Sequence, residues 1–198
     1  MIFKYAINTY ASGFSTVKLH NYFKSQNVKL SRQTINNFIK FGEETFLLYR
    51  LPQFFKGFKR SNQSRKKLYV VDNSLIGLFI TEPQNGRLLE NEVYLELLRF
   101  KERDPSVQIR YLNGKEGEID FLVSRGDSLI YAIQVSYELT PSNMEREIGP
   151  LLKARDKLKS KRNIMITFNR PERDIQVGKG IEIMTFAEWA LMETGKST

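Results

Sequence analysis

The sequence contains no cysteine and only one histidine, His20, among its 198 residues. The lack of cysteine excludes disulfides, zinc–thiolate sites and cysteine nucleophiles. With one imidazole, neither a two-histidine metal site nor a Ser-His-Asp triad can be built except around His20. No run of about 18 apolar residues occurs, so no membrane span or membrane partner is expected. The N-terminal segment lacks the apolar stretch of a secretory signal, and the composition therefore predicts a cytoplasmic protein.

Acidic residues are scarce in the first part of the chain. Residues 1–80 contain thirteen Lys/Arg and three Asp/Glu, a net charge of +10, whereas residues 81–198 contain eighteen and nineteen, a net charge of −1. A strongly basic segment usually meets a polyanion, although a generally basic proteome would be an alternative explanation. We therefore predict two domains, residues 1–80 and 81–198, of which the first binds nucleic acid.

Two amphipathic helices and a basic hairpin are predicted in residues 1–80. Ser15 is suited to cap a helix that ends near Asn27. Ser31 is suited to cap a second helix, whose apolar positions include Phe38 and Phe41. Two strand-like runs then flank the polar turn "SNQS".

This order predicts a helix-turn-helix followed by a hairpin, which is a winged helix. Side chains on the second helix and around the hairpin turn are candidates for contacts with phosphates and base edges of DNA. They are Arg32, Gln33, Asn36, Lys40, Lys56, Lys59, Arg60, Arg65, Lys66 and Lys67. The alternative is a protein-interaction module with a solvated basic loop.

A glutamate is predicted on the apolar side of the next helix, "GRLLENEVYLELLRFKER". The residues three, four and seven places after Glu90 are Val93, Tyr94 and Leu97. A carboxylate on such a stripe is costly unless it is paired or binds a ligand. The alternative is an anion that stays partly wet near the helix N-terminus. The stripe expected to face water consists of Glu92, Glu96, Arg99 and Arg103.

Polar residues recur inside the strand-like runs that follow, at 107–112, 118–123 and 129–136. Because strands alternate faces, Glu118 and Asp120 share one face, and Gln134 and Ser136 share another. The turn "SRGDS" would join the last two strands as a hairpin and bring these faces together. A helix containing Pro150, which suggests a break or a start at that point, and a strand at 163–168 come next. The order is therefore helix, three strands, helix, strand.

Oxygen ligands from this helix and hairpin could converge on one hard cation. Mg²⁺ prefers oxygen ligands and needs only one or two carboxylates. Such an ion can activate water and stabilise charge on a phosphodiester.

Trp189, near the end of the chain, is expected to be buried in the hydrophobic core.

Several segments resemble the C-terminal module of a large family of prokaryotic AAA+ ATPases: "LSRQTINNFIKFGEETFLLYRL", "KKLYVVDNSLIGLF", "LLENEVYLELLR", "GEIDFLV" and "IQVS". The resemblance covers nearly all of the chain. It implies an α+β fold, with an N-terminal winged helix followed by a restriction-endonuclease-like α-β-β-β-α-β domain of the PD-(D/E)XK nuclease superfamily. It also implies an AAA+ ATPase domain as partner in full-length relatives.

The resemblance further implies a catalytic set of Glu90, Asp120, Gln134 and Ser136, of which Glu90, Asp120 and Gln134 would hold Mg²⁺. Gln134 takes the (D/E) place, which keeps an oxygen donor but removes a charge. Ser136 takes the lysine place, which removes the cationic helper. A lysine from another element, Lys153 or Lys157, is an alternative source of that charge.

Three hypotheses stay open at this point. The chain is an Mg²⁺-dependent endonuclease, an inactive nuclease fold that binds DNA or RNA, or a protein-interaction module that targets an ATPase. ATP binding is not expected for these residues. The tail "ETGKST" ends like a P-loop, but Ala190 stands where a Walker A motif needs glycine.

Overall fold

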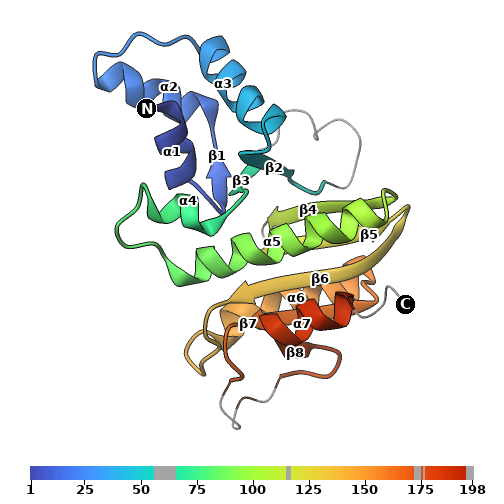
Figure 1. Ribbon diagram of the computed structural model, residues 1–198. Helices are drawn as coiled ribbons and strands as arrows, with labels where there is room; N and C mark the ends of the chain where they lie inside the picture. Colours follow the sequence, from blue (N-terminus) through green and yellow to red (C-terminus); the bar gives the residue numbers. More distant parts are fainter. Residues whose placement is uncertain (56–65, 115–116, 172–174, 176, 195–198) are drawn as a thin grey trace.

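The computed structural model describes residues 1–55, 66–114, 117–171, 175 and 177–194. Its N-terminal part contains three helices and a three-stranded antiparallel sheet with the order β1-β3-β2 (Figure 1). The elements are α1 (Ile2–Asn8), β1 (Ser12–Phe14), α2 (Thr16–Ser25), α3 (Arg32–Glu44), β2 (Leu48–Pro52) and β3 (Lys66–Val70). The predicted caps are confirmed, because Ser15 accepts a hydrogen bond from the Lys18 amide and Ser31 from the Thr34 amide.

The C-terminal part is built on a five-stranded mixed sheet with the order β4-β5-β6-β7-β8. The first three strands are antiparallel neighbours, whereas β7 pairs parallel with β6, and β8 parallel with β7. A parallel pair needs a long crossover, and α6 supplies it between β6 and β7. The elements are α4 (Asn73–Gly77), α5 (Asn85–Arg103), β4 (Val107–Gly114), β5 (Gly117–Arg125), β6 (Ser128–Ser136), α6 (Met144–Leu158), β7 (Arg162–Thr167), β8 (Glu182–Thr185) and α7 (Phe186–Thr194). The predicted α+β class is confirmed.

Helices cover both faces of the five-stranded sheet. Helices α5 and α7 pack on one face, and α6 packs on the other (Figure 1). The larger hydrophobic core extends from Ile2 through β3 to Trp189, which is fully buried as expected. This core crosses the predicted boundary at residues 80/81, and the division into two domains stays a prediction. One further link joins the sheets: the Phe54 amide donates to the Tyr111 carbonyl at 2.6 Å.

Three local expectations are wrong. Helix α6 runs without interruption from Met144 to Leu158, so Pro150 neither breaks nor starts it. Phe38 and Phe41, which the helical period groups with Ile35 and Ile39, lie exposed on α3, whereas Ile35, Ile39 and Gly42 are buried. Glu96 does not face water: its side chain is buried and pairs with Arg99 at 2.6 Å. The helical period shows which side of a helix is apolar, but the number of residues buried on that side depends on the elements packed against it.

Gly117, at the start of β5, combines a conformation that favours glycine with a very close contact to a neighbouring side chain. Its φ is +114°, and a Cβ there would lie 2.6 Å from Cγ of Pro150. We expect Gly117→Ala to lower the free energy of unfolding by about 1–3 kcal/mol because the backbone must stay strained. Gly86→Ala on α5 is the control, since a Cβ there meets open space and alanine favours helix. Equal effects of both changes in urea denaturation would contradict this assignment.

Candidate functional site

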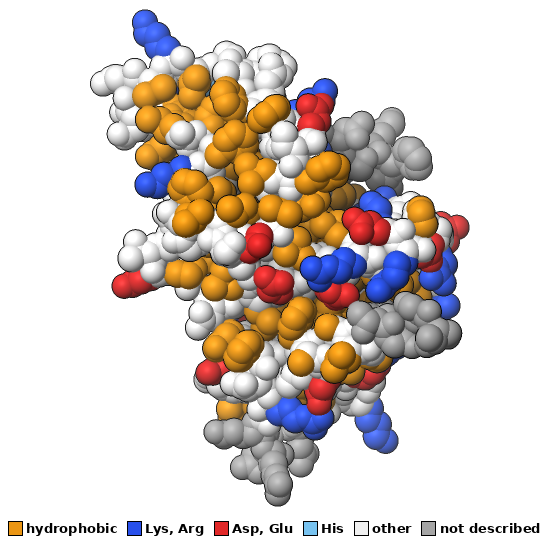
Figure 2. All heavy atoms as spheres, viewed as in Figure 1, with side chains coloured by type: hydrophobic (Ala, Val, Ile, Leu, Met, Phe, Trp, Pro, Cys, Tyr) orange, Lys and Arg blue, Asp and Glu red, His pale blue; other side chains and the backbone are white. Residues whose placement is uncertain are grey.

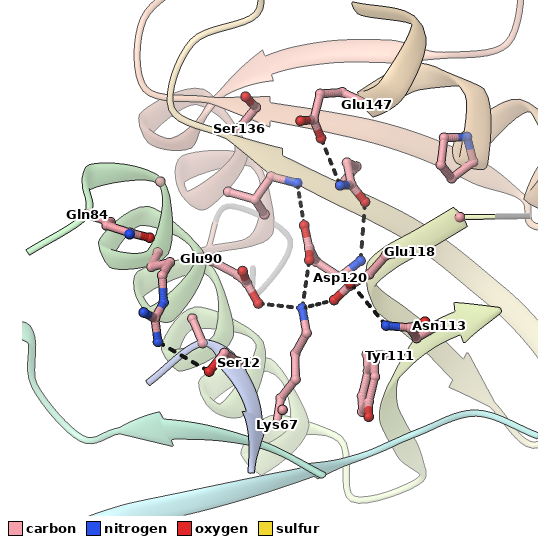
Figure 3. Close-up of a pocket in the computed structure, with 18 of the residues that line it drawn as sticks. Ser12, Lys67, Gln84, Glu90, Tyr111, Asn113, Glu118, Asp120, Ser136 and Glu147 are labelled. Atoms are coloured by element: carbon pink, nitrogen blue, oxygen red, sulfur yellow. Dashed lines mark hydrogen bonds and ion pairs between the residues drawn. The ribbon is translucent and has the colours of Figure 1, made fainter. Parts of the chain in front are cut away.

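A buried lysine lies at the centre of three carboxylates. The Lys67 side chain, on β3, is only 5% exposed, and its Nζ lies 2.9 Å from Glu90 Oε1 on α5. On β5, Asp120 Oδ1 lies 2.9 Å from the same nitrogen, and Glu118 Oε1 lies 2.7 Å from it (Figure 3). Glu118 and Asp120 can both reach it because residues two apart share a strand face. An ammonium group has three donors, and each carboxylate takes one.

Several further polar atoms in and around the cluster are also hydrogen-bonded within the chain. Asp120 Oδ2 accepts from the Val135 amide at 3.0 Å. Gln134 Oε1 accepts from the Asp120 amide at 3.3 Å, and its Nε2 donates to Glu147 Oε2 at 3.0 Å. Glu90 Oε1 also accepts from the Tyr69 hydroxyl at 2.7 Å. Asp120 and Gln134 are therefore brought together as predicted, but their oxygens are used in an internal network.

Burial and charge shift the ionisation of the cluster in opposite directions. Burial raises the pKa of Glu90 to about 7, the Asp120 carboxylate adds to the shift, and the Lys67 ammonium and Tyr69 hydroxyl oppose it. For Lys67, burial lowers the pKa, but Asp120, Glu90 and Glu118 together raise it well above its usual value. Lys67 is therefore a permanent cation at neutral pH.

The cluster lies in a cavity of about 700 Å³ between the two parts of the chain. Residues from β1, α2, α5, β4, β5, β6 and α6 line it, together with Lys67 of β3 (Figure 3). Basic side chains also border it, namely Lys18, Arg87 and Arg146. The cavity is thus an open, charged site to which both parts contribute.

Ser136 and the two alternative lysines do not join the cluster. Ser136 lines the same cavity, but its hydroxyl donates to the Glu138 carbonyl at 2.7 Å. Lys153 and Lys157 line a neighbouring cavity of about 340 Å³. The lysine that meets the carboxylates comes instead from β3, before the whole predicted nuclease-like segment.

The position of Lys67 differs from the prediction. Lys67 was expected beside the hairpin turn, in contact with DNA. It is buried instead, because it forms ion pairs with carboxylates of α5 and β5. Lys66 is half-buried at the start of β3. Exposed on α3 are Arg32, Gln33, Asn36 and Lys40. Outside the described residues lie Lys56, Lys59, Arg60 and Arg65.

Sequence reasoning missed three residues that build the site. Glu147 is buried on α6, where it holds Gln134 and pairs with Arg146 at 2.6 Å. Tyr69 follows Lys67 by two positions and so lies on the same strand face, a spacing that could have indicated it. Asn91 is fully buried, and its amide bonds both the amide and the carbonyl of Val70 at 2.9 Å. No local pattern marks Asn91.

The donor chemistry of the cluster suits Mg²⁺, but the arrangement does not. Mg²⁺ needs oxygen ligands at about 2.0–2.1 Å in an octahedron, whereas the carboxylates of Glu90, Glu118 and Asp120 are spread around an ammonium. Among the described residues, no group of three or more His, Cys, Asp or Glu side chains is placed to hold a metal ion. The expected magnesium site stays a prediction.

Comparison with known proteins places the chain in a family. Residues 85–189 match the family described as "Domain of unknown function (DUF4143)", and residues 2–84 match "Domain of unknown function (DUF8612)". An uncharacterized protein of Methanocaldococcus jannaschii is 35% identical over 193 residues, which cover 93% of this chain and 42% of that protein. An uncharacterized protein of Haemophilus influenzae is 33% identical over 182 residues, covering 88% of this chain and 41% of that protein.

The chain thus spans about two fifths of the length of these curated relatives. No solved structure gives a significant match. In the described part of the chain, no helix has the length and apolar character needed to cross a membrane. The DUF4143 match covers more than half of the 198 residues, and the chain therefore belongs to the DUF4143 family.

Proposed function

We propose that this chain is a nucleic-acid-binding module, in which a winged helix is joined to a nuclease-like domain that does not hydrolyse phosphodiesters. The observation that carries the proposal is the set of exposed basic side chains on α2, on the turn after it and on α3. Lys24 and Lys29 line a cavity of about 690 Å³ at the turn between these helices, together with His20 and Ser31. A basic groove beside the start of a helix suits phosphates.

The order of elements supports the fold named in this proposal. Two helices and a hairpin in the succession α2, α3, β2, β3 are typical of a winged helix. The succession α5, β4, β5, β6, α6, β7 corresponds to the α-β-β-β-α-β order of restriction-endonuclease-like domains. In the mixed sheet, the antiparallel hairpin β5–β6 carries Asp120 and Gln134, as the resemblance requires.

The exposed side chains of α3 support DNA as the partner. Arg32, Gln33 and Lys40 project from this helix into solvent, and such groups can contact phosphates and base edges. Lys40 forms an exposed pair with Glu44 at 3.3 Å, which is weak and easily exchanged for a phosphate. The net charge of +10 over residues 1–80 adds long-range attraction.

Three features support a module that does not cut nucleic acid. Ser136 provides no positive charge, and its hydroxyl is bound to the Glu138 carbonyl. The oxygen of Gln134 is bound to the Asp120 amide. The carboxylates face the Lys67 ammonium, and without a divalent cation they would repel a phosphodiester.

Reversing two charges on α3 tests the proposal. We expect the double change Arg32→Glu and Lys40→Glu to weaken binding to labelled duplex DNA. Because each phosphate contact contributes about 0.9 to the slope of log affinity against log salt, two lost contacts should reduce that slope by about 2. Fluorescence anisotropy over a salt series measures both quantities. Lys101→Glu with Lys161→Glu, at exposed positions of the balanced part, is the matched control.

The same samples, incubated with Mg²⁺ or Mn²⁺ and duplex, single-stranded and branched DNA, are expected to remain uncut. Metal-dependent products that disappear in Asp120→Ala would instead establish an active endonuclease. Absence of binding at moderate salt by the unaltered chain would overturn the nucleic-acid proposal itself.

A protein-interaction role is the second candidate, and exposed aromatic residues favour it. Hydrophobic side chains gather over the N-terminal helices in Figure 2. In and just after α3, Phe38 is 43% exposed, Phe41 56% and Phe46 69%, and exposed apolar patches often mark protein interfaces. We propose an AAA+ ATPase domain as the partner, as the resemblance implies, and the curated relatives have more than half of their length outside the matched part. If this candidate is right, charge reversal at Arg32 and Lys40 should not change binding of the partner protein.

A further inference from the structure

The position of Lys67 bears on how the acidic site works, independently of nucleic-acid binding. Its ammonium is held by one oxygen from each of Glu90, Glu118 and Asp120, at 2.7–2.9 Å. The side chain is 5% exposed. A lysine is almost never buried to this degree unless it is paired. The cluster is therefore a binding site for a cation, and the cation that occupies it is the Lys67 ammonium group of the same chain.

The three metal ligands that the resemblance implies already have partners within the chain. Asp120 uses one oxygen for Lys67 and the other for the Val135 amide. Glu90 Oε1 is shared between Lys67 and the Tyr69 hydroxyl. Gln134, which the resemblance gives as a metal ligand, turns its oxygen to the Asp120 amide and its nitrogen to Glu147. A divalent ion would have to displace Lys67 and rearrange this network.

Charge also favours the lysine as the resident cation. Lys67 is tethered on β3, so it competes with a dissolved ion at the effective concentration of an intramolecular group. Its transfer out of the cluster would separate a buried ammonium from the buried carboxylates of Glu90 and Asp120, and breaking a buried ion pair is strongly unfavourable. A hydrated Mg²⁺ ion must in addition lose water, which it does reluctantly.

We infer that Lys67 takes the place of the divalent cation that the resemblance implies, so that the acidic cluster is a metal-independent clamp between β3, α5 and β5. The resident cation comes from residues 1–80, whereas all three carboxylates come from residues 81–198. The clamp thereby ties the predicted nucleic-acid-binding part to the nuclease-like part. Removal of the ammonium should expose a set of hard oxygen donors, because the carboxylates remain in one cavity.

Mn²⁺ binding to the full chain, without nucleic acid, tests this inference. Electron paramagnetic resonance of free Mn²⁺ gives the bound fraction directly. We expect one bound Mn²⁺ per chain in Lys67→Ala. Over a Mn²⁺ range that extends at least tenfold above the concentration that half-saturates this variant, we expect no saturation of the unaltered chain. Adding Asp120→Asn to Lys67→Ala should abolish the binding. Lys66→Ala, one position earlier and outside the cluster, should behave like the unaltered chain.

Two results would overturn the inference. One is saturable binding of Mn²⁺ by the unaltered chain that disappears in Asp120→Asn, because the site would then accept a metal with Lys67 present. The other is a folded Lys67→Ala variant that binds Mn²⁺ no better than the unaltered chain. If Lys67→Ala folds only when Mn²⁺ is added, as followed by circular dichroism, the metal replaces the ammonium and the inference is supported. If that variant does not fold at all, the Mn²⁺ titration of the unaltered chain remains the test: saturable binding that depends on Asp120 contradicts the inference, and no saturable binding supports it.

Discussion

Replacing Lys67 with methionine is expected to lower the free energy of unfolding by about 3–5 kcal/mol, the usual cost of removing one partner from a buried ion cluster. Methionine is similar in length and fills the space of the lysine stem. The loss therefore reports the charge rather than the packing. Glu90 and Asp120 would be left as buried carboxylates without their cation, and mutual repulsion would add to the desolvation cost.

Equilibrium unfolding in urea measures this loss. Lys66→Met is the control, and we expect it to change stability by less than about 0.5 kcal/mol because this lysine lies outside the cluster. Adding Glu90→Gln and Asp120→Asn to Lys67→Met should recover part of the lost stability, since neutral amides do not need the ammonium. A loss of the same size in Lys66→Met, or no recovery in the triple variant, would contradict the charge-based explanation.

The loss caused by Lys67→Met should grow with pH between about 5 and 8. Folding raises the pKa of Glu90 to about 7, so this group stabilises the fold at low pH, and the contribution is lost as pH rises through that value. In the variant the ammonium that opposes the shift is absent, and the pKa of Glu90 rises further. In the unaltered chain Glu90 ionises as pH passes about 7 and the linked loss of stability levels off, whereas in the variant Glu90 stays protonated and the loss continues toward pH 8. The same urea titrations at both pH values show the trend.

Replacing Asn91 with alanine is expected to destabilise the fold by roughly 2–6 kcal/mol, because two buried backbone groups lose their partners at about 1–3 kcal/mol each. The Asn91 amide oxygen accepts from the Val70 amide, and its nitrogen donates to the Val70 carbonyl, both at 2.9 Å. The side chain thus pairs with β3 as another strand would. It anchors α5 next to the position of Glu90 and so supports the alignment of the cluster.

Asn37→Ala on α3 is the matched control for Asn91→Ala, because Asn37 is exposed and accepts only an exposed hydrogen bond from Gln33. We expect the control to stay within about 0.5 kcal/mol of the unaltered chain. Hydrogen exchange of the Val70 amide gives a second measurement, and its protection should fall in Asn91→Ala. Unchanged stability and unchanged protection together would show that water replaces the asparagine at no cost.

Local chemistry in the sequence determined much of the fold. Serine caps at Ser15 and Ser31 were predicted because a hydroxyl before an apolar period satisfies free helix amides. The strand alternation in residues 117–136 placed Asp120 beside Gln134, and the helical period turned Glu90 toward the core. These features depend on residues a few positions apart, and the sequence displays such spacings directly.

Tertiary structure alone decided the character of the site. Lys67 meets Glu90 across 23 residues and Asp120 across 53, and no local pattern links such distant positions. A lysine beside a basic turn was predicted to be exposed, because isolated lysines are rarely buried. Packing of β3 between α5 and β5 supplied three carboxylates that make its burial favourable. The sequence by itself indicated that Glu90 and Asp120 face the core, and only the packing of the two parts determined that Lys67 lies between them.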